Sequence, residues 1–157
     1  MEEIMRRTWL VLAVMVVASL MALSVLDLAL AGSGRQRLNL SGRSDTRPFS
    51  HAVLAGDTLY VAGSIGIDPA TGAPPAKIED EIHLVLDALK SKLALGGMTM
   101  NDLVSVQIFC PDLALYGPFN EVYATYFDDG FPARAFVGSG PLLFGAHFEV
   151  TGIAVKQ

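Results

Sequence analysis

Residues 79–93 read Glu-Asp-Glu-Ile-His-Leu-Val-Leu-Asp-Ala-Leu-Lys-Ser-Lys-Leu, and their apolar positions repeat with the period of a helix. Three acidic residues open the segment, where they favour the N-terminal end of a helix dipole, and Gly96 and Gly97 follow its end. The pattern predicts an amphipathic helix with one buried face. Its apolar stripe comprises Ile82, Val85, Leu86, Leu89 and Leu93.

Short segments of strand character flank this helix on both sides. Residues 51–54 and 58–62 are separated by Ala55-Gly56-Asp57, which predicts a hairpin. After the helix, residues 102–109 alternate loosely between apolar and polar and stop at Pro111. Three further elements are expected: a second helix from about Pro118 to Asp128-Asp129-Gly130, with a stripe of Phe119, Val122, Tyr123 and Tyr126, and two final strands over 133–138 and 147–155.

The predicted order β-β-α-β-α-β-β defines an α+β domain in which one face of a sheet is buried under two helices. The other face also carries apolar and aromatic side chains, so it requires a cover. A second copy of the chain is the simplest cover, and we therefore expect a homo-oligomer.

The N-terminal part of the chain has a different composition. Trp9 to Leu26 contains no charged residue, Arg6 and Arg7 precede it, and Ala29-Leu30-Ala31 follows. Residues 1–31 are interpreted as a signal peptide cleaved near Ala31, which predicts an exported protein, periplasmic or secreted; the alternative is an uncleaved membrane anchor. Residues 32–48 are polar and are expected to form a flexible linker, whose four arginines are either solvated or contact acidic lipid headgroups. The folded domain is expected over 49–157.

Charge and residue spacing exclude several functions. The full chain has a net charge of −5, and residues 32–157 have 13 acidic and nine basic side chains, which disfavours a nucleic-acid partner. His51, His83 and His147 are not spaced as metal ligands. Cys110, the only cysteine, cannot form an intrachain disulfide and is expected to be a buried apolar side chain.

Two charged residues stand out because they lie within apolar strands. Arg134 is flanked by Pro132-Ala133 and Ala135-Phe136, and Glu149 lies between Phe148 and Val150. A buried guanidinium requires a carboxylate. Either Arg134 and Glu149 pair with each other, across the sheet or across a subunit interface, or both serve a site.

Five motifs, in this order along the chain, favour a site. They are Leu59-Tyr60-Val61-Ala62-Gly63, Asp68-Pro69-Ala70-Thr71-Gly72, Asn120-Glu121-Val122-Tyr123 with Tyr126-Phe127, Pro132-Ala133-Arg134 and Phe148-Glu149-Val150. Together they resemble the RidA (YjgF) family, over residues 48–155. The resemblance implies a chorismate-mutase-like α+β fold, a homotrimer, and clefts between subunits in which 2-imino acids of the 2-iminopropanoate and 2-iminobutanoate type are hydrolysed to 2-keto acids and ammonia. It implies neither a cofactor nor a metal.

The resemblance also assigns roles to residues of this chain. Arg134 would bind the substrate carboxylate, because a planar guanidinium matches it with two parallel hydrogen bonds, and Glu149 would handle the protons and the attacking water. The backbone N–H of Phe136 would complete the carboxylate cradle. Phe49 and Ala62 stand at substrate-binding positions where the family carries tyrosine and serine, so two hydroxyls are missing. The alternative is a trimeric binding module for small keto or carboxylic acids, whereas the acidic charge disfavours RNA cleavage.

Overall fold

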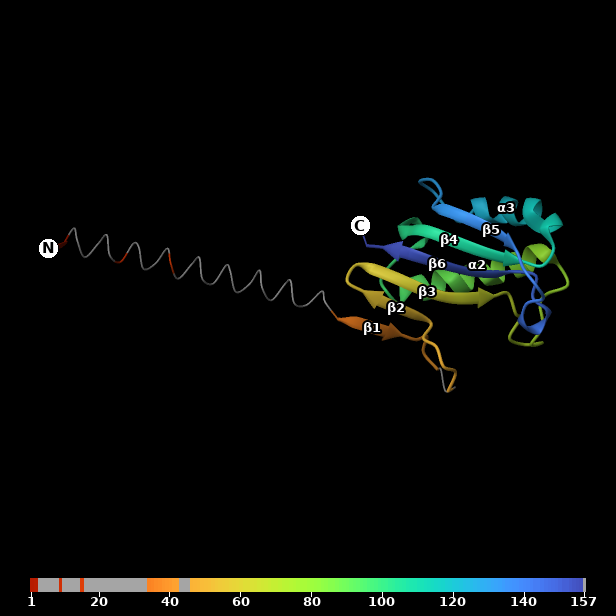
Figure 1. Cartoon of the computed structure of the whole chain (residues 1–157), viewed down its shortest axis with the longest axis horizontal. Helices are drawn as coiled ribbons and strands as arrows, with labels where there is room; N and C mark the ends of the chain where they lie inside the picture. The colour runs from red at the N-terminus through yellow and green to blue at the C-terminus, as the bar shows by residue number, and fades with distance from the viewer. Residues whose placement is uncertain (3–8, 10–14, 16–33, 43–45, 157) are drawn as a thin grey trace. The chain divides into compact units, whose positions relative to one another are not determined.

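The computed structural model describes residues 1–2, 9, 15, 34–42 and 46–156 (Figure 1). The chain divides into two units, Met1–Gly34 and Arg35–Gln157. The predicted signal peptide or anchor falls almost entirely outside the described residues. Within the described parts of the chain, no helix is both long and apolar enough to cross a membrane.

The second unit is built around one six-stranded sheet with the order β1-β2-β3-β6-β4-β5. All neighbouring strands are antiparallel except β4 and β5, which are parallel. The strands are β1 Arg35–Leu38, β2 Ala52–Ala55, β3 Thr58–Ile65, β4 Leu103–Cys110, β5 Ala133–Gly138 and β6 Glu149–Val155; the helices are α2 Ile78–Ala94 and α3 Tyr116–Ala124. Short 3-10 turns precede β4, α3 and β6, at Met100–Asp102, Leu113–Leu115 and Leu143–Gly145.

Strand β1 is a correction to the sequence analysis, because Arg35–Leu38 lie within the segment expected to be a flexible linker. Its backbone pairs with β2 in register Arg35↔Ala55, although its arginines are exposed. His51 holds the next residues: its Nδ1 accepts from the N–H of Leu40 at 3.1 Å, and its own N–H donates to Oδ1 of Asn39 at 3.0 Å. Backbone pairing orders this segment, and apolar patterning cannot reveal it.

Several element boundaries also differ from the sequence prediction by a few residues, and the side-chain contacts explain two of them. Helix α3 ends at Ala124, so Tyr126 lies beyond it; the hydroxyl of Thr125 donates to the carbonyl of Val122 at 2.7 Å and closes the last turn. Strand β6 starts at Glu149, and not at His147, because backbone N–H groups at this point are held by a helix side chain described below.

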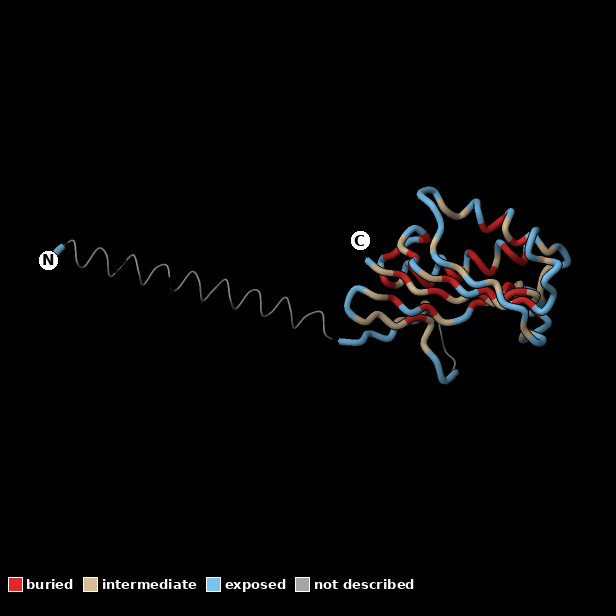
Figure 2. The backbone as a smooth tube through the Cα atoms, turned by 45° about the horizontal axis from the view of Figure 1, so that its top comes forward, coloured by how far each residue is buried: buried red, intermediate tan, exposed pale blue. Residues whose placement is uncertain are grey.

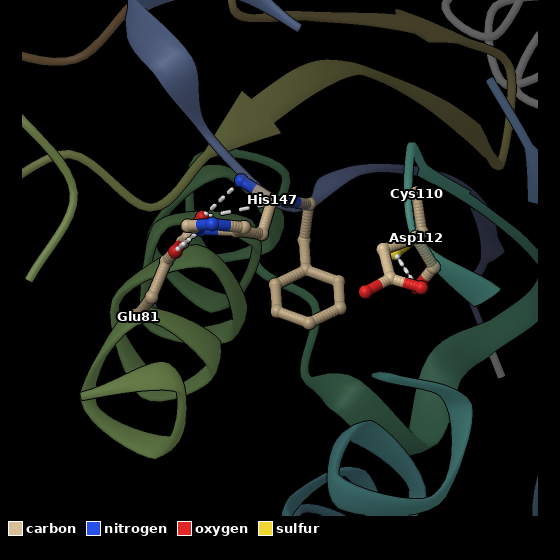
Figure 3. A network of polar contacts seen from close by, with 5 residues as sticks. Glu81, Cys110, Asp112 and His147 are labelled. Atoms are coloured by element: carbon tan, nitrogen blue, oxygen red, sulfur yellow. Dashed lines mark hydrogen bonds and ion pairs between the residues drawn. The ribbon is translucent and has the colours of Figure 1, made fainter. Parts of the chain in front are cut away.

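The core lies between the sheet and the two helices, which contact each other and lie on the same side of the sheet (Figure 1). Figure 2 shows buried backbone concentrated in the central strands and on the inner sides of the helices. The predicted helix stripe is confirmed, since all five of its residues are 0% exposed. Cys110 is buried as expected, and its Sγ donates to the carbonyl of Asp112 (Figure 3).

The two faces of the sheet are distinguished along β6. Val150 and Ala154 are fully buried under the helices, whereas Glu149, Thr151 and Ile153 alternate with them and are half-buried on the opposite face. We call this second face the open face. It is not covered by α2 or α3, and the exposed ring of Tyr60 lies on it.

Candidate functional site

Arg134 lies on the helix-covered face, near the edge of the sheet. Its partner in the parallel pairing of β5 with β4 is Val106, which is buried under the helices. The Nη2 atom of Arg134 donates to Oδ1 of Asn120 in α3 at 2.6 Å. The guanidinium carbon lies 4.7 Å from the ring centroid of Tyr123 and 5.8 Å from that of Tyr116. Helix α3 therefore holds the cation by one hydrogen bond and two cation–π contacts.

A pocket of about 470 Å³ opens beside this guanidinium, lined by Asn120, Tyr123, Ala124, Phe131, Pro132 and Arg134. A guanidinium has five N–H donors, and the hydrogen bond to Asn120 uses one of them. The pocket is thus largely apolar with one cation in its wall. That combination suits a small anionic molecule with an apolar body.

Tyr123 is a residue of this pocket that the sequence analysis assigned only to a helix stripe. Its side chain is buried, and its hydroxyl has no hydrogen-bond partner within the described residues. Burial raises the pKa of Tyr123 to about 12, against the opposing effect of the Arg134 charge, so the phenol stays neutral at physiological pH. The phenol therefore presents an aromatic face to the guanidinium and carries no charge of its own.

Phe136, two residues after Arg134, supports the same region with its side chain. Its ring packs edge-on against Tyr116 at 5.1 Å and against Phe119 at 5.5 Å between centroids. These contacts fix β5 to α3 next to Arg134. The carboxylate-binding role expected of the Phe136 backbone N–H stays a prediction.

Glu149 occupies a different place, at the start of β6 on the open face. It pairs with Ile65 of β3 and Phe109 of β4. The hydrogen-bond ladder between β3 and β6 is interrupted by a bulge between Val61 and Ser64. The carboxylate of Glu149 lies against Gly63 inside that bulge. A Cβ on Gly63 would collide with Oε1 of Glu149, so only glycine leaves room for the carboxylate there.

Ala62 belongs to the same bulge, and Phe49 is linked to it through His51. The N–H of Ala62 donates to the carbonyl of His51 at 3.0 Å, and the His51 ring meets the Phe49 ring edge-on at 6.4 Å. Phe49 is 47% exposed. Four of the predicted site residues therefore lie in two places: Ala62 and Glu149 at the bulge between β3 and β6, and Arg134 and Phe136 on β5 beside α3.

Arg134 and Glu149 do not pair across the sheet of one chain. Arg134 shares the helix-covered face with Val106. Side chains alternate between the two faces along β6, and Glu149 lies on the open face. The hydrogen-bond partner of the guanidinium is the neutral amide of Asn120. Pairing across the sheet is therefore wrong, and a contact across a subunit interface stays a prediction.

Two charged residues of α2 that the sequence analysis did not single out hold the strands next to Glu149. Glu81 is completely buried and accepts from the N–H groups of His147 and Phe148 and from Nδ1 of His147, the first and last at 2.7 Å (Figure 3). Lys92, eleven residues later on the same helix face, donates to backbone carbonyls of β3. The sequence feature that could have identified these two residues is their position, because each is next to a residue of the apolar stripe.

The comparisons with known proteins agree with this architecture. Residues 43–156 match the family described as Endoribonuclease L-PSP. The fold, and the match over most of the chain, define a member of the RidA (YjgF) family, and the chain belongs to that family. It is 34% identical over 110 residues to the 2-iminobutanoate/2-iminopropanoate deaminase of Mus musculus, an alignment that covers 69% of this chain and 82% of the mouse protein. It is 37% identical over 111 residues to a RutC family protein of Pyrococcus horikoshii, covering 70% and 88% of the two chains.

Solved structures confirm the predicted chorismate-mutase-like α+β fold. The YjgF gene product of E. coli superposes with a TM-score of 0.70 at 25% identity, covering 78% of this chain and 99% of the other. E. coli TdcF with bound serine superposes with a TM-score of 0.71 at 26% identity, with the same coverage.

Proposed function

We propose that this protein hydrolyses small 2-imino acids to 2-keto acids and ammonia, in clefts between the subunits of a homotrimer. The observation that carries the proposal is the pocket beside Arg134, in which a guanidinium lies at the wall of an otherwise largely apolar cavity. A 2-imino acid has a carboxylate that matches this cation and a small apolar side chain that matches the remaining surface. The relative named 2-iminobutanoate/2-iminopropanoate deaminase supports the substrate class, and TdcF with bound serine shows that a similar fold accepts a small amino acid.

The reaction needs a water molecule at the C=N carbon and proton transfer to nitrogen. The Glu149 carboxylate takes a proton from the attacking water as the C–O bond forms, and it returns that proton to the departing nitrogen. As the C=O bond of the keto acid forms and the C–N bond breaks, Glu149 takes the hydroxyl proton of the tetrahedral intermediate and passes it to the NH2 group, which leaves as ammonia. Because imines hydrolyse readily without a catalyst, a 100-fold acceleration requires only about 2.7 kcal/mol of transition-state stabilisation. Positioning of substrate and water is sufficient for a contribution of this size.

The site needs residues from two copies of the chain. Arg134 and Glu149 lie on opposite faces of the sheet within one chain, so a single copy does not present both to one substrate. The open face carries apolar side chains and a hollow of about 330 Å³ lined by Tyr60, Val61, Ser105, Gln107, Thr151, Gly152 and Ile153. Covering that face with a neighbouring subunit removes apolar surface from water and brings the Glu149 region of one copy towards another copy.

The direct test follows the decay of 2-iminobutanoate generated in place by an amino-acid oxidase, with semicarbazide trapping of the remaining imine. The wild-type protein is expected to accelerate decay, and Arg134→Ala to lower kcat/KM about 100-fold through loss of the carboxylate contact. Arg37→Ala, which removes an exposed arginine of β1, is the matched control and should behave as wild type.

Glu149→Gln separates the enzyme from a binding module. In the enzyme, this variant binds 2-oxobutanoate as wild type does and loses turnover, because the amide cannot take the proton from water. A wild-type protein that binds 2-oxobutanoate without any turnover would support the binding module instead. The absence of hydroxyls at Phe49 and Ala62 is consistent with either outcome.

A further inference from the structure

Lys92 is a charged residue in the apolar interior of the domain. It lies on the side of α2 that faces the sheet, next to Leu93 and one turn after Leu89, both of which are completely buried. The lysine itself is only 6% exposed. Burial of an ammonium group is costly unless hydrogen bonds and an opposite charge compensate for it. Its position therefore calls for an explanation beyond packing.

The contacts of the ammonium group supply the first part of the explanation. Nζ of Lys92 donates to the carbonyl of Gly63 at 2.7 Å and to the carbonyl of Ala62 at 3.0 Å. Both residues belong to the bulge in β3, where the regular ladder to β6 is interrupted between Val61 and Ser64. A bulge leaves backbone groups without their ladder partners. The lysine satisfies two carbonyls there and fixes the shape of the bulge.

The position of Glu149 supplies the second part. Its carboxylate lies against Gly63, the residue whose carbonyl Lys92 holds, so the bulged strand has the ammonium on its helix side and the carboxylate close to the same residue. The two groups interact electrostatically: burial lowers the pKa of Lys92 to about 8, the Glu149 charge acts to raise it, and the Arg47 charge acts to lower it. Glu149 is thus the anion that offsets the buried cation.

We infer that Lys92 is a positioning residue for Glu149. Its hydrogen bonds fix the Gly63 bulge from the helix side, and its charge attracts the carboxylate and keeps it in the orientation that the reaction requires. The inference rests on the proposed function, in which Glu149 transfers the protons. Lys92 does not line the pocket beside Arg134. It therefore acts on the chemical step and leaves the binding of the substrate carboxylate unchanged.

The kinetic test compares Lys92→Met with Lys90→Met, which removes an exposed ammonium from the same helix. Lys92→Met is expected to lower kcat for 2-iminobutanoate by about 10- to 100-fold with KM within about twofold of wild type, because displacement of a proton-transfer group by up to about 1 Å has effects of this size. Lys90→Met should retain both constants. Lys92→Arg, which keeps the charge and the donors, should recover part of the lost kcat. Wild-type kcat in a folded Lys92→Met protein would overturn the inference.

A second measurement tests the arrangement without using activity and without changing Lys92. The titration of the Lys92 amine is followed by NMR in protein containing 13C-labelled lysine, with Lys92→Met used to assign the signal. Glu149→Gln should lower the pKa of Lys92 below its value of about 8, because it removes the charge that raises it, whereas Glu121→Gln on the exposed side of α3 should leave it unchanged.

The two measurements separate this inference from the proposed function. A Lys92 titration that is indifferent to Glu149→Gln rules out the coupling, whatever the activity of the protein. If the wild-type protein fails to accelerate imine decay, the proposed function falls, and with it the catalytic role of Lys92; a titration that still responds to Glu149→Gln would then show that the arrangement itself is present.

Discussion

The two faces of the sheet use charge in different ways. On the helix-covered face, Arg134 is held by Asn120 and aromatic rings at the rim of a pocket. On the open face, Glu149 of β6 lies against Gly63 of β3, and the buried Lys92 binds the carbonyl of that glycine from the helix side. In the proposed reaction, the helix-covered face binds the anionic substrate and the open face supplies the proton-transfer group. Neither face of one chain carries both, which is why the proposed reaction requires two copies.

Mixing two inactive variants tests this difference most strongly. Arg134→Ala and Glu149→Gln are each expected to be inactive alone. When the two are unfolded together and refolded at equal concentrations, about a quarter of the sites between subunits receive Arg134 from one chain and Glu149 from another, so about a quarter of wild-type activity should return. The measurement is imine decay before and after mixing.

Mixed protein that stays inactive, although mass spectrometry shows mixed oligomers, would mean that both residues of each site come from the same chain. The contrast between the two faces would then have no bearing on catalysis.

Two glycine substitutions sharpen the contrast between the faces. Gly63→Ala places a Cβ against the end of the flexible Glu149 side chain, so stability should change by less than about 1 kcal/mol while kcat falls about 100-fold. Gly152→Ala, on the helix-covered face, places a Cβ 2.8 Å from Cδ2 of Leu103 and 3.2 Å from the carbonyl oxygen of Ser105, so it should destabilise the fold by about 1–3 kcal/mol.

Urea unfolding together with imine-decay kinetics measures both effects. A large loss of stability in Gly63→Ala, with kcat retained, would show that the space over Gly63 serves packing and not the placement of Glu149.

The buried lysine predicts a pH dependence of stability. The pKa of Lys92 is lowered from 10.5 to about 8, so between these values the unfolded chain binds more protons than the folded chain, and stability rises with pH. Below pH 8 the lysine is charged in both states and its burial opposes folding to the full extent. Relative to Lys92→Met, the wild-type protein should therefore gain stability from pH 8 to pH 10, by at most about 3 kcal/mol.

Urea unfolding at several pH values measures this gain, with Lys90→Met as the matched control. A constant difference between wild type and Lys92→Met over this pH range would show that the lysine is not buried in solution as the structure places it.

The order of the elements from β2 onwards was predictable from the sequence, because each has a strong local signal. The stripe at Ile82, Val85, Leu86, Leu89 and Leu93 fixed α2, and strand β5 was predicted over the same residues that form it. Strand β1 was missed, since three of its four residues are polar and the strand is ordered by backbone pairing with β2. The bulge at Gly63 was missed for the same reason: no side-chain pattern marks a break in a hydrogen-bond ladder.

The sequence by itself determined the family, the α+β fold, and the two charged residues that interrupt apolar strands, because these depend on residue types and their spacing along the chain. Only the tertiary structure decided on which face of the sheet Arg134 and Glu149 lie, and that Asn120 and Lys92 accompany them. These facts depend on strand order, register and a bulge, which bring together residues 14 to 86 positions apart, from Asn120 with Arg134 to Gly63 with Glu149. The pleat alternates faces at every residue, so the side of the sheet that faces the helices is set by packing of the whole domain and not by any local motif.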